Sequence, residues 1–247
     1  MNGTDTVALV TGANKGIGYE AARQLGALGM TVLLGARDPE RRDAAVAALR
    51  AESLEVHPLT LDVADDESVR AAAERVGDRF GRLDVLVNNA GISGGARQPP
   101  GAADLGGVRA VFETNLFGVV RVTDAMLPFL AKSAAGRVVN VSSGTASMTH
   151  MNDPDHHFTG MPGNVAYPVS KTALNALTVQ YAKHLRPLGV LVNAVAPGAC
   201  DTDFARDLGL AFPRTAAQGA AVVVRLATLG ADGPTGGFFD ENGPVPW

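Results

Sequence analysis

A regular alternation of two apolar patterns is the strongest constraint on the fold of this chain. Short apolar runs typical of strands alternate with longer patterns typical of helices from Val7 to Val195. This order favours a parallel sheet, because a helix between two strands returns the chain to the edge where it started. The sequence therefore predicts an α/β fold, a doubly wound parallel sheet with helices on both faces. A chain of 247 residues suits one such domain, 1–247, with a large core.

A glycine-rich turn joins the first strand-like run to the first helical pattern. The apolar run ending at Val10 leads into Thr11-Gly12-Ala13-Asn14-Lys15-Gly16-Ile17-Gly18, and helix formers continue from Tyr19 to Leu28. Glycines let the backbone turn tightly and approach a pyrophosphate, which the free N–H groups and the dipole of a helix N-terminus attract. A strand before the turn and a helix after it predict a dinucleotide site of Rossmann type. Its expected cofactor contacts are Gly12, Asn14, Lys15, Gly16, Ile17 and Gly18.

The end of the second strand-like run bears on which dinucleotide binds. An NAD site places a carboxylate near this point for the ribose 2′-OH, and Ala36 offers none. The guanidinium of Arg37 can instead pair bidentately with a 2′-phosphate, and Lys15 adds a second cation. At 4 Å and an effective dielectric of 20, each charge pair contributes on the order of 4 kcal/mol before desolvation. We therefore expect NADP(H) as the cofactor, the alternative being that both cations are solvated surface charges.

Asp38 complicates this prediction, because its carboxylate could bond the ribose. Pro39 suits the first position of a helix and Glu40 its first turn. These neighbours favour Asp38 as the N-cap of the second helix.

Tyr167-Pro168-Val169-Ser170-Lys171 places a phenol and an ammonium four residues apart on a predicted helix. That spacing puts both side chains on one face. The ammonium is expected to lower the pKa of the phenol from about 10, because a nearby positive charge favours phenolate. Such a phenol can exchange a proton with an alcohol or carbonyl oxygen. Alone, however, a Tyr and a Lys at this spacing usually mark an amphipathic surface.

Further polar segments follow the later strand-like runs, where the carboxyl ends of parallel strands meet and bind ligands. They are Asp62-Val63, Asn88-Asn89-Ala90-Gly91, Ser142-Ser143 and Pro197-Gly198-Ala199-Cys200-Asp201-Thr202. Asn115 lies within an apolar helical pattern, where a buried amide needs a hydrogen-bonding partner. It is either a satisfied core asparagine or part of a site.

Taken in order, these motifs resemble those of the short-chain dehydrogenase/reductase family, and most of all its NADPH-dependent carbonyl reductase branch. The resemblance runs nearly end to end. It implies that Asn115, Ser143, Tyr167 and Lys171 are catalytic, with Ser143 chosen over Ser142 by the family register. It also implies cofactor contacts beyond the glycine turn and Arg37, at Asp62, Val63, Asn89, Ala90, Gly91, Tyr167, Lys171, Pro197, Gly198, Cys200 and Thr202.

An apparent insertion near 146–163 separates Ser143 from Tyr167. It contains His150, His156 and His157 together with aspartates, but no helix-spaced pair of ligands, so we predict no metal site. A polar loop that forms part of the substrate pocket is favoured. In the resembled branch such inserts can also mask the usual subunit interface. We therefore expect a homo-oligomer, a dimer or tetramer, or a monomer if the insert covers that interface.

Composition limits the classes of partner that this chain is expected to bind. A net charge of −4 without a basic cluster argues against nucleic acid. The absence of a signal sequence and of a long apolar run leads us to expect a cytoplasmic protein with no membrane partner. A single cysteine, Cys200, excludes an internal disulfide.

The expected function is NADPH-dependent reduction of a small ketone or aldehyde to the alcohol, with Tyr167 as general acid. Two alternatives remain. A 3-ketoacyl thioester reductase is disfavoured by the insert and by the lack of a basic patch for an acidic carrier protein. A catalytically silent NADPH-binding regulator is disfavoured by the complete catalytic set.

Overall fold

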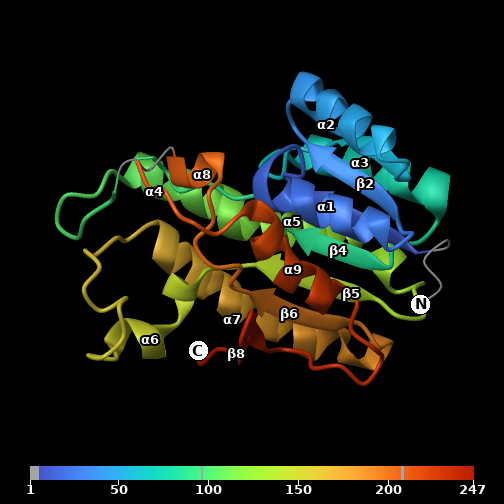
Figure 1. The fold of residues 1–247 in the computed structure, drawn as a ribbon. Coiled ribbons are helices and arrows are strands. Elements are labelled where there is room, and N and C mark those ends of the chain that lie inside the picture. Colours follow the sequence, from blue (N-terminus) through green and yellow to red (C-terminus); the bar gives the residue numbers. More distant parts are fainter. Residues whose placement is uncertain (1–5, 96, 207–208) are drawn as a thin grey trace.

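The computed structural model describes residues 6–95, 97–206 and 209–247. Their strands form one sheet in the order β3-β2-β1-β4-β5-β6-β7-β8 (Figure 1). Neighbouring strands from β3 to β7 pair in parallel, and β8 pairs antiparallel with β7. The predicted α/β class and doubly wound sheet are confirmed. Positions 1–5, 96, 207 and 208 of the predicted domain 1–247 lie outside the described residues.

The strands and helices alternate over most of the chain. The strands are β1 Val7–Thr11, β2 Thr31–Ala36, β3 Val56–Thr60, β4 Val85–Asn88, β5 Arg137–Val141, β6 Leu191–Val195, β7 Phe238–Asp240 and β8 Gly243–Pro244. The α-helices are α1 Gly16–Ala27, α2 Pro39–Ala51, α3 Asp66–Phe80, α4 Leu105–Phe112, α5 Gly118–Leu130, α6 Met148–Asn152, α7 Tyr167–Leu185, α8 Asp203–Arg206 and α9 Ala216–Ala227. Within the described residues, no helix has both the length and the apolar character needed to cross a membrane.

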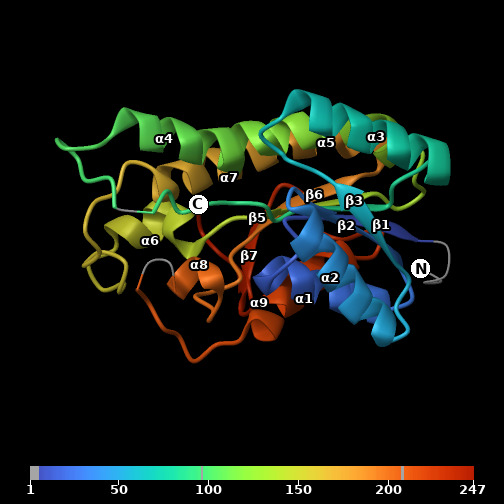
Figure 2. The ribbon, with the colours of Figure 1, turned by 90° about the horizontal axis from the view of Figure 1, so that it is seen from above.

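Helices cover both faces of the sheet (Figure 2). Successive side chains of a strand point to opposite faces, and β1 supplies both cores in this way. Ala8 and Val10 pack in the core that α1, α2 and α9 cover, whereas Val7 and Leu9 pack in the core under α3, α5 and α7. Because β1 is buried on both sides, it is continuously apolar from Val7 to Val10.

The strand order reverses at β1, which lies between β2 and β4. At such a switch point the connecting helices leave towards opposite faces and open a crevice at the carboxyl ends of the strands. The glycine-rich turn follows β1 at this crevice. The segments after β4, β5 and β6 lie along the same edge, so the polar segments singled out in the sequence converge there.

Three local features differ from the sequence-based expectations. The helical pattern around Asn115 is divided into α4, a π-helical turn Glu113–Phe117, and α5. The insert, expected to be a loop, includes the short helix α6. The small strands β7 and β8 follow the last predicted strand. They are defined by the pairing of β7 with β6 and of β8 with β7, and not by a long apolar run.

Candidate active site

Helix α7 begins at Tyr167 and places Lys171 one turn further along the same face. The Lys171 Nζ atom lies 5.8 Å from the centre of the Tyr167 ring. It donates a hydrogen bond of 2.7 Å to the carbonyl oxygen of Val141, the last residue of β5. Lys171 is 4% exposed, so this bond anchors a buried ammonium beside the phenol.

Burial governs the acidity of both groups. It raises the pKa of the Tyr167 phenol to about 12, against the weaker opposite effect of a hydrogen bond with the Ser143 side chain. It lowers the pKa of the Lys171 ammonium to about 8. The predicted lowering of the Tyr167 pKa is therefore wrong for this structure. Desolvation of the phenolate is the largest cause of the shift, and no local spacing of residues reports it.

The two serines after β5 have different surroundings. Ser142 is buried, and its hydroxyl donates to the main-chain oxygen of Lys171 at 3.3 Å. Ser143 is partly exposed, lies beside the Tyr167 phenol, and has its Oγ 2.9 Å from Thr145 Oγ1. Since alternation turns neighbouring residues in opposite directions, Ser143 is the serine that faces the candidate site.

Asn115 joins two parts of the site from the π-helical turn. Its Oδ1 accepts from the Ile92 amide at 2.8 Å, and its Nδ2 donates to the Ile92 carbonyl at 2.9 Å. The same Nδ2 also donates to Ser170 Oγ at 3.1 Å. The fully buried side chain thus ties the segment after β4 to α7. These contacts satisfy the amide, and its catalytic role stays a prediction.

Gly91 lies between Asn115 and Lys171. A methyl group built on its Cα would come within 3.3 Å of Asn115 Oδ1 and 3.5 Å of Lys171 Nζ. The predicted catalytic residues therefore come together at one place, although they are spread over three segments of the chain.

The glycine turn is held to the segment after β4. Asn89 Nδ2 donates to the carbonyls of Thr11 at 2.9 Å and Gly12 at 3.2 Å. A methyl group on Gly18 would lie 2.3 Å from Asn89 Nδ2, and one on Gly12 would lie 2.9 Å from the Ala90 Cα. Glycine is required at both positions by packing within the chain. Gly12 also has φ +61°, a conformation that favours glycine.

The same turn suits a pyrophosphate. Helix α1 begins at Gly16, and no side chain among the described residues caps its first N–H groups. Asn14 and Ile17 are partly buried beside these groups. Free amides at a helix N-terminus, reached across glycines, match the requirements of a dinucleotide.

The two predicted 2′-phosphate cations differ in their surroundings. Arg37 is exposed at the end of β2. Lys15 is also exposed, but its Nζ is 2.8 Å from Asp203 Oδ2 of α8. Asp38 caps α2 as predicted, since its Oδ1 accepts from the Arg41 amide at 3.1 Å.

The remaining predicted cofactor positions lie on neighbouring segments. Asp62 is partly buried and accepts from the Ala64 amide at 3.0 Å, and Val63 next to it is buried. Cys200 is buried after β6, and burial raises the pKa of its thiol. Thr202 lies against the glycine turn, 3.4 Å from a methyl group built on Gly16.

Other residues at the site were missed from the sequence. Ser170 is the partner of Asn115, and its Oγ also donates to the Tyr167 carbonyl at 2.7 Å. The Phe204 ring of α8 lies 5.3 Å from the Tyr167 ring. Phe158 of the insert packs on Gly144, where an added methyl group would come within 2.8 Å of its ring. Ser170 lies inside the motif of Tyr167 and Lys171, and Phe158 lies in the insert that was predicted to form part of the substrate pocket. Nothing in the sequence linked Phe204 to the site.

Comparison with known proteins agrees with this architecture. The family model described as short chain dehydrogenase matches residues 6–211. A short-chain dehydrogenase of Penicillium roqueforti is 37% identical over 233 residues, covering 92% of this chain and 90% of its own. A 3-oxoacyl-[acyl-carrier-protein] reductase of Synechocystis is 36% identical over 206 residues, 83% of this chain and 78% of its own.

A solved structure extends the likeness to nearly the whole chain. The NADPH-bound carbonyl reductase from chicken fatty liver superposes with a TM-score of 0.84 at 28% identity, covering 99% of this chain and 100% of that one. The sheet order, the glycine turn and the family match lead to one conclusion. This chain is a member of the short-chain dehydrogenase/reductase family of oxidoreductases.

Proposed function

We propose that this oxidoreductase uses NADPH to reduce a ketone or aldehyde carbonyl to the alcohol. The observation that carries the proposal is the meeting of Ser143, Tyr167 and buried Lys171 at the carboxyl ends of the strands. A hydroxyl, a phenol and an ammonium at one point suit the binding and protonation of a carbonyl oxygen.

The cofactor would lie along the crevice between the glycine turn and the segment after β4. The free amides of α1 would hold its pyrophosphate, and Arg37 would pair with the 2′-phosphate. Lys15 would also bind the 2′-phosphate only if its ammonium left Asp203 or contacted both groups at once. When bound, NADPH supplies the hydride for the reaction.

The residues of the chain supply the rest of the chemistry. A phenol with a pKa of about 12 keeps its proton at neutral pH, so Tyr167 is ready to donate to the carbonyl oxygen. The Ser143 hydroxyl would donate a second hydrogen bond to the same carbonyl oxygen. Lys171, mostly charged below its pKa of about 8, would stabilise negative charge as it develops on the phenol. Asn115 would hold α7 and the segment at Ile92 in fixed positions relative to each other.

A 3-ketoacyl thioester is a second candidate substrate. The likeness to an acyl-carrier-protein reductase of Synechocystis favours it. The superposition on a carbonyl reductase over the whole chain, insert included, favours a free ketone or aldehyde.

Steady-state kinetics would test these functions. The parent protein and the Tyr167→Phe variant are assayed with NADPH on activated ketones, aldehydes and a 3-ketoacyl thioester of N-acetylcysteamine. We expect turnover of free carbonyls and a loss of at least about 10²-fold in the variant, the low end for a general acid. A preference for the thioester would favour the second candidate. Tight NADPH binding without turnover of any carbonyl would favour a silent regulator instead.

A further inference from the structure

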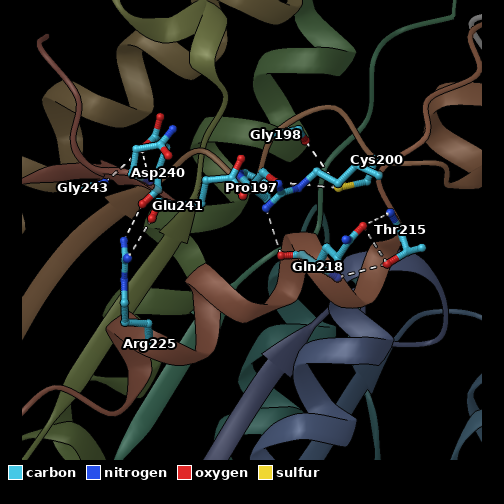
Figure 3. A network of polar contacts seen from close by, with 11 residues as sticks. Pro197, Gly198, Cys200, Thr215, Gln218, Arg225, Asp240, Glu241 and Gly243 are labelled. Carbon is cyan, nitrogen blue, oxygen red and sulfur yellow. Dashed lines mark hydrogen bonds and ion pairs between the residues drawn. The ribbon is translucent and has the colours of Figure 1, made fainter.

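The loop Pro197–Cys200 leaves β6 at the carboxyl edge of the sheet and is held by neighbours distant in sequence. Figure 3 shows it next to Thr215 and Gln218 at the start of α9 and near Glu241 of the β7–β8 hairpin. The Cys200 thiol faces its own loop, 3.7 Å from the Pro197 carbonyl and 3.6 Å from that of Gly198. The loop therefore has little internal support beyond these weak sulfur contacts.

Arg214 touches this loop along its length. Its main-chain oxygen accepts from the Asp201 amide at 2.8 Å. Its side chain lies on Gly198, where an added methyl group would come within 3.2 Å of Nε. Its guanidinium also lies beside the Cys200 thiol and opposes the effect of burial on the pKa of that thiol. Gly219 of α9 packs on the same loop, where an added methyl group would come within 2.5 Å of Cys200 Sγ, so Arg214 and α9 both contact the loop.

Two further groups fix the guanidinium in this position. Arg214 Nη2 donates to the Gln218 carbonyl at 3.0 Å, and Nη1 pairs with the carboxylate of Glu241. The Arg214 side chain is 20% exposed and that of Glu241 is 54% exposed, so only the guanidinium of this ion pair is shielded from solvent. A partly shielded pair with directed hydrogen bonds is worth more than the usual surface pair.

The hairpin that presents Glu241 is anchored independently. Arg225 of α9 donates to the main-chain oxygens of Asp240 and Glu241 (Figure 3). These bonds hold the hairpin but do not reach the loop. Two contacts link the hairpin to the loop: the Ala196 amide, just before the loop, donates to the Phe239 carbonyl of β7 at 2.7 Å, and the Arg214 side chain joins Glu241 to Gly198 and Cys200.

We propose that Arg214 is a positioning residue whose ion pair with Glu241 clamps the loop Pro197–Cys200 in its closed conformation. Loss of the pair lets the loop open and exposes Cys200. The loop contains predicted cofactor contacts, so a looser loop also weakens NADPH binding. This second consequence rests on the proposed function, and the first does not.

The chain contains one cysteine, so labelling of Cys200 by iodoacetamide measures the opening of the loop directly. The free protein is labelled and the product is followed by mass spectrometry. We expect labelling at least about tenfold faster in Arg214→Met and Glu241→Gln, because the closed loop loses its clamp. The matched control, Arg225→Met, removes a guanidinium bound to the same hairpin and should stay within about twofold of the parent.

Electrostatics alone would change the rate in the opposite direction. The Arg214 charge lowers the pKa of the Cys200 thiol, so its removal reduces the reactive thiolate fraction. Faster labelling of Arg214→Met therefore reports exposure, whereas in Glu241→Gln the loss of a carboxylate that raises the pKa of the thiol would by itself speed labelling. Arg214→Lys keeps the charge and should restore slow labelling in part. If Arg214→Met does not fold, as judged by circular dichroism, Glu241→Gln carries the test, because that side chain is 54% exposed. Its labelling rate is then corrected for the thiolate fraction, which the pH dependence of labelling gives for each variant.

Unchanged labelling in Glu241→Gln and Arg214→Met would overturn the clamp. Equally fast labelling in Arg225→Met would also overturn it, because loosening of the hairpin would then be the cause. The NADPH dissociation constant of the same variants is measured by fluorescence and should rise as the closed fraction falls. Fast labelling with an unchanged NADPH dissociation constant would support the clamp. It would also show that this loop does not contact the cofactor.

Discussion

At the scale of single residues, desolvation moves both Tyr167 and Lys171 towards their neutral forms. The pKa of Tyr167 rises to about 12 and that of Lys171 falls to about 8. Near pH 7 the phenol keeps its proton, and the ammonium is still mostly charged. The protonation state needed for carbonyl reduction therefore lies within the physiological range, with Lys171 as the group closest to titration.

The pH profile of carbonyl reduction should show this titration. Lys171 is charged below its pKa of about 8 and neutral above it, so kcat/KM should fall as pH rises through about 8. The profile is measured from pH 6 to 10 with saturating NADPH. The Lys171→Arg variant has a guanidinium that does not titrate in this range. If it is active, its kcat/KM should not fall near pH 8. A flat profile in the parent between pH 7 and 9.5 would contradict the assignment.

At the scale of elements, the loops at the carboxyl edge are locked to one another by close backbone contacts. Asn89 after β4 bonds to the carbonyls of the glycine turn after β1, and Gly18 of α1 leaves the space for its amide. Asn115 ties the segment after β4 to α7. Small changes at these contacts should therefore affect the whole edge.

Gly18→Ala should destabilise the fold although alanine favours helices. The new methyl group would lie 2.3 Å from Asn89 Nδ2 and 2.6 Å from the Gly12 carbonyl, so both must move. We expect a loss of about 1–3 kcal/mol in the free energy of unfolding, typical of overpacking. Urea denaturation measures it. Gly160→Ala, which meets nothing within 4 Å, is the control and should change stability by less than about 0.5 kcal/mol.

The insert contacts the candidate site through Phe158, whose ring packs on Gly144 next to Ser143. Phe158→Ala should therefore change KM for the carbonyl substrate and the ranking of substrates by kcat/KM. It should leave the NADPH dissociation constant within about a few-fold, because the ring does not contact the glycine turn. Met148→Ala, at a 59% exposed side chain of α6, is the matched control. If both variants had the same kinetics across a varied carbonyl panel, the insert would have no part in substrate recognition.

At the scale of the whole molecule, two cores pack on either side of one sheet. They fix the positions of the strands whose carboxyl ends line the crevice. The carboxyl edge is assembled from segments far apart in the sequence, and both cores contain residues of the strands that end there. A ligand that bridges these segments should therefore raise the stability of the entire fold.

NADPH should raise the melting temperature more than NADH at equal concentration. A ligand at 100 times its Kd stabilises by about 2.7 kcal/mol, and each kcal/mol shifts Tm by roughly 2–4 °C in a domain of this size. Differential scanning fluorimetry measures both shifts. Arg37→Ala should reduce the NADPH shift and leave the NADH shift unchanged, because it removes the exposed cation that we propose pairs with the 2′-phosphate. An equal or larger shift with NADH in the parent would contradict the cofactor preference.

The sequence by itself determined the order of elements and the identity of the candidate site. Apolar runs buried on both faces, glycines at positions of close approach, and the N-cap Asp38 are local signals, because short-range sterics and burial require particular residue types. The helix spacing that brings Tyr167 and Lys171 onto one face is local as well. These signals gave the α/β class, the sheet and the segments at its carboxyl edge.

The tertiary structure decided what depends on surroundings. The pKa of Tyr167 follows from burial against other segments, which no local pattern reports. The choice of Ser143 over Ser142, the contact of Phe158 with Gly144, and the strands β7 and β8 depend on partners distant in the chain. The Arg214–Glu241 pair joins residues that no motif connects. Long-range packing creates these properties, since desolvation and contact are set by what the fold places beside a group, not by its neighbours in sequence.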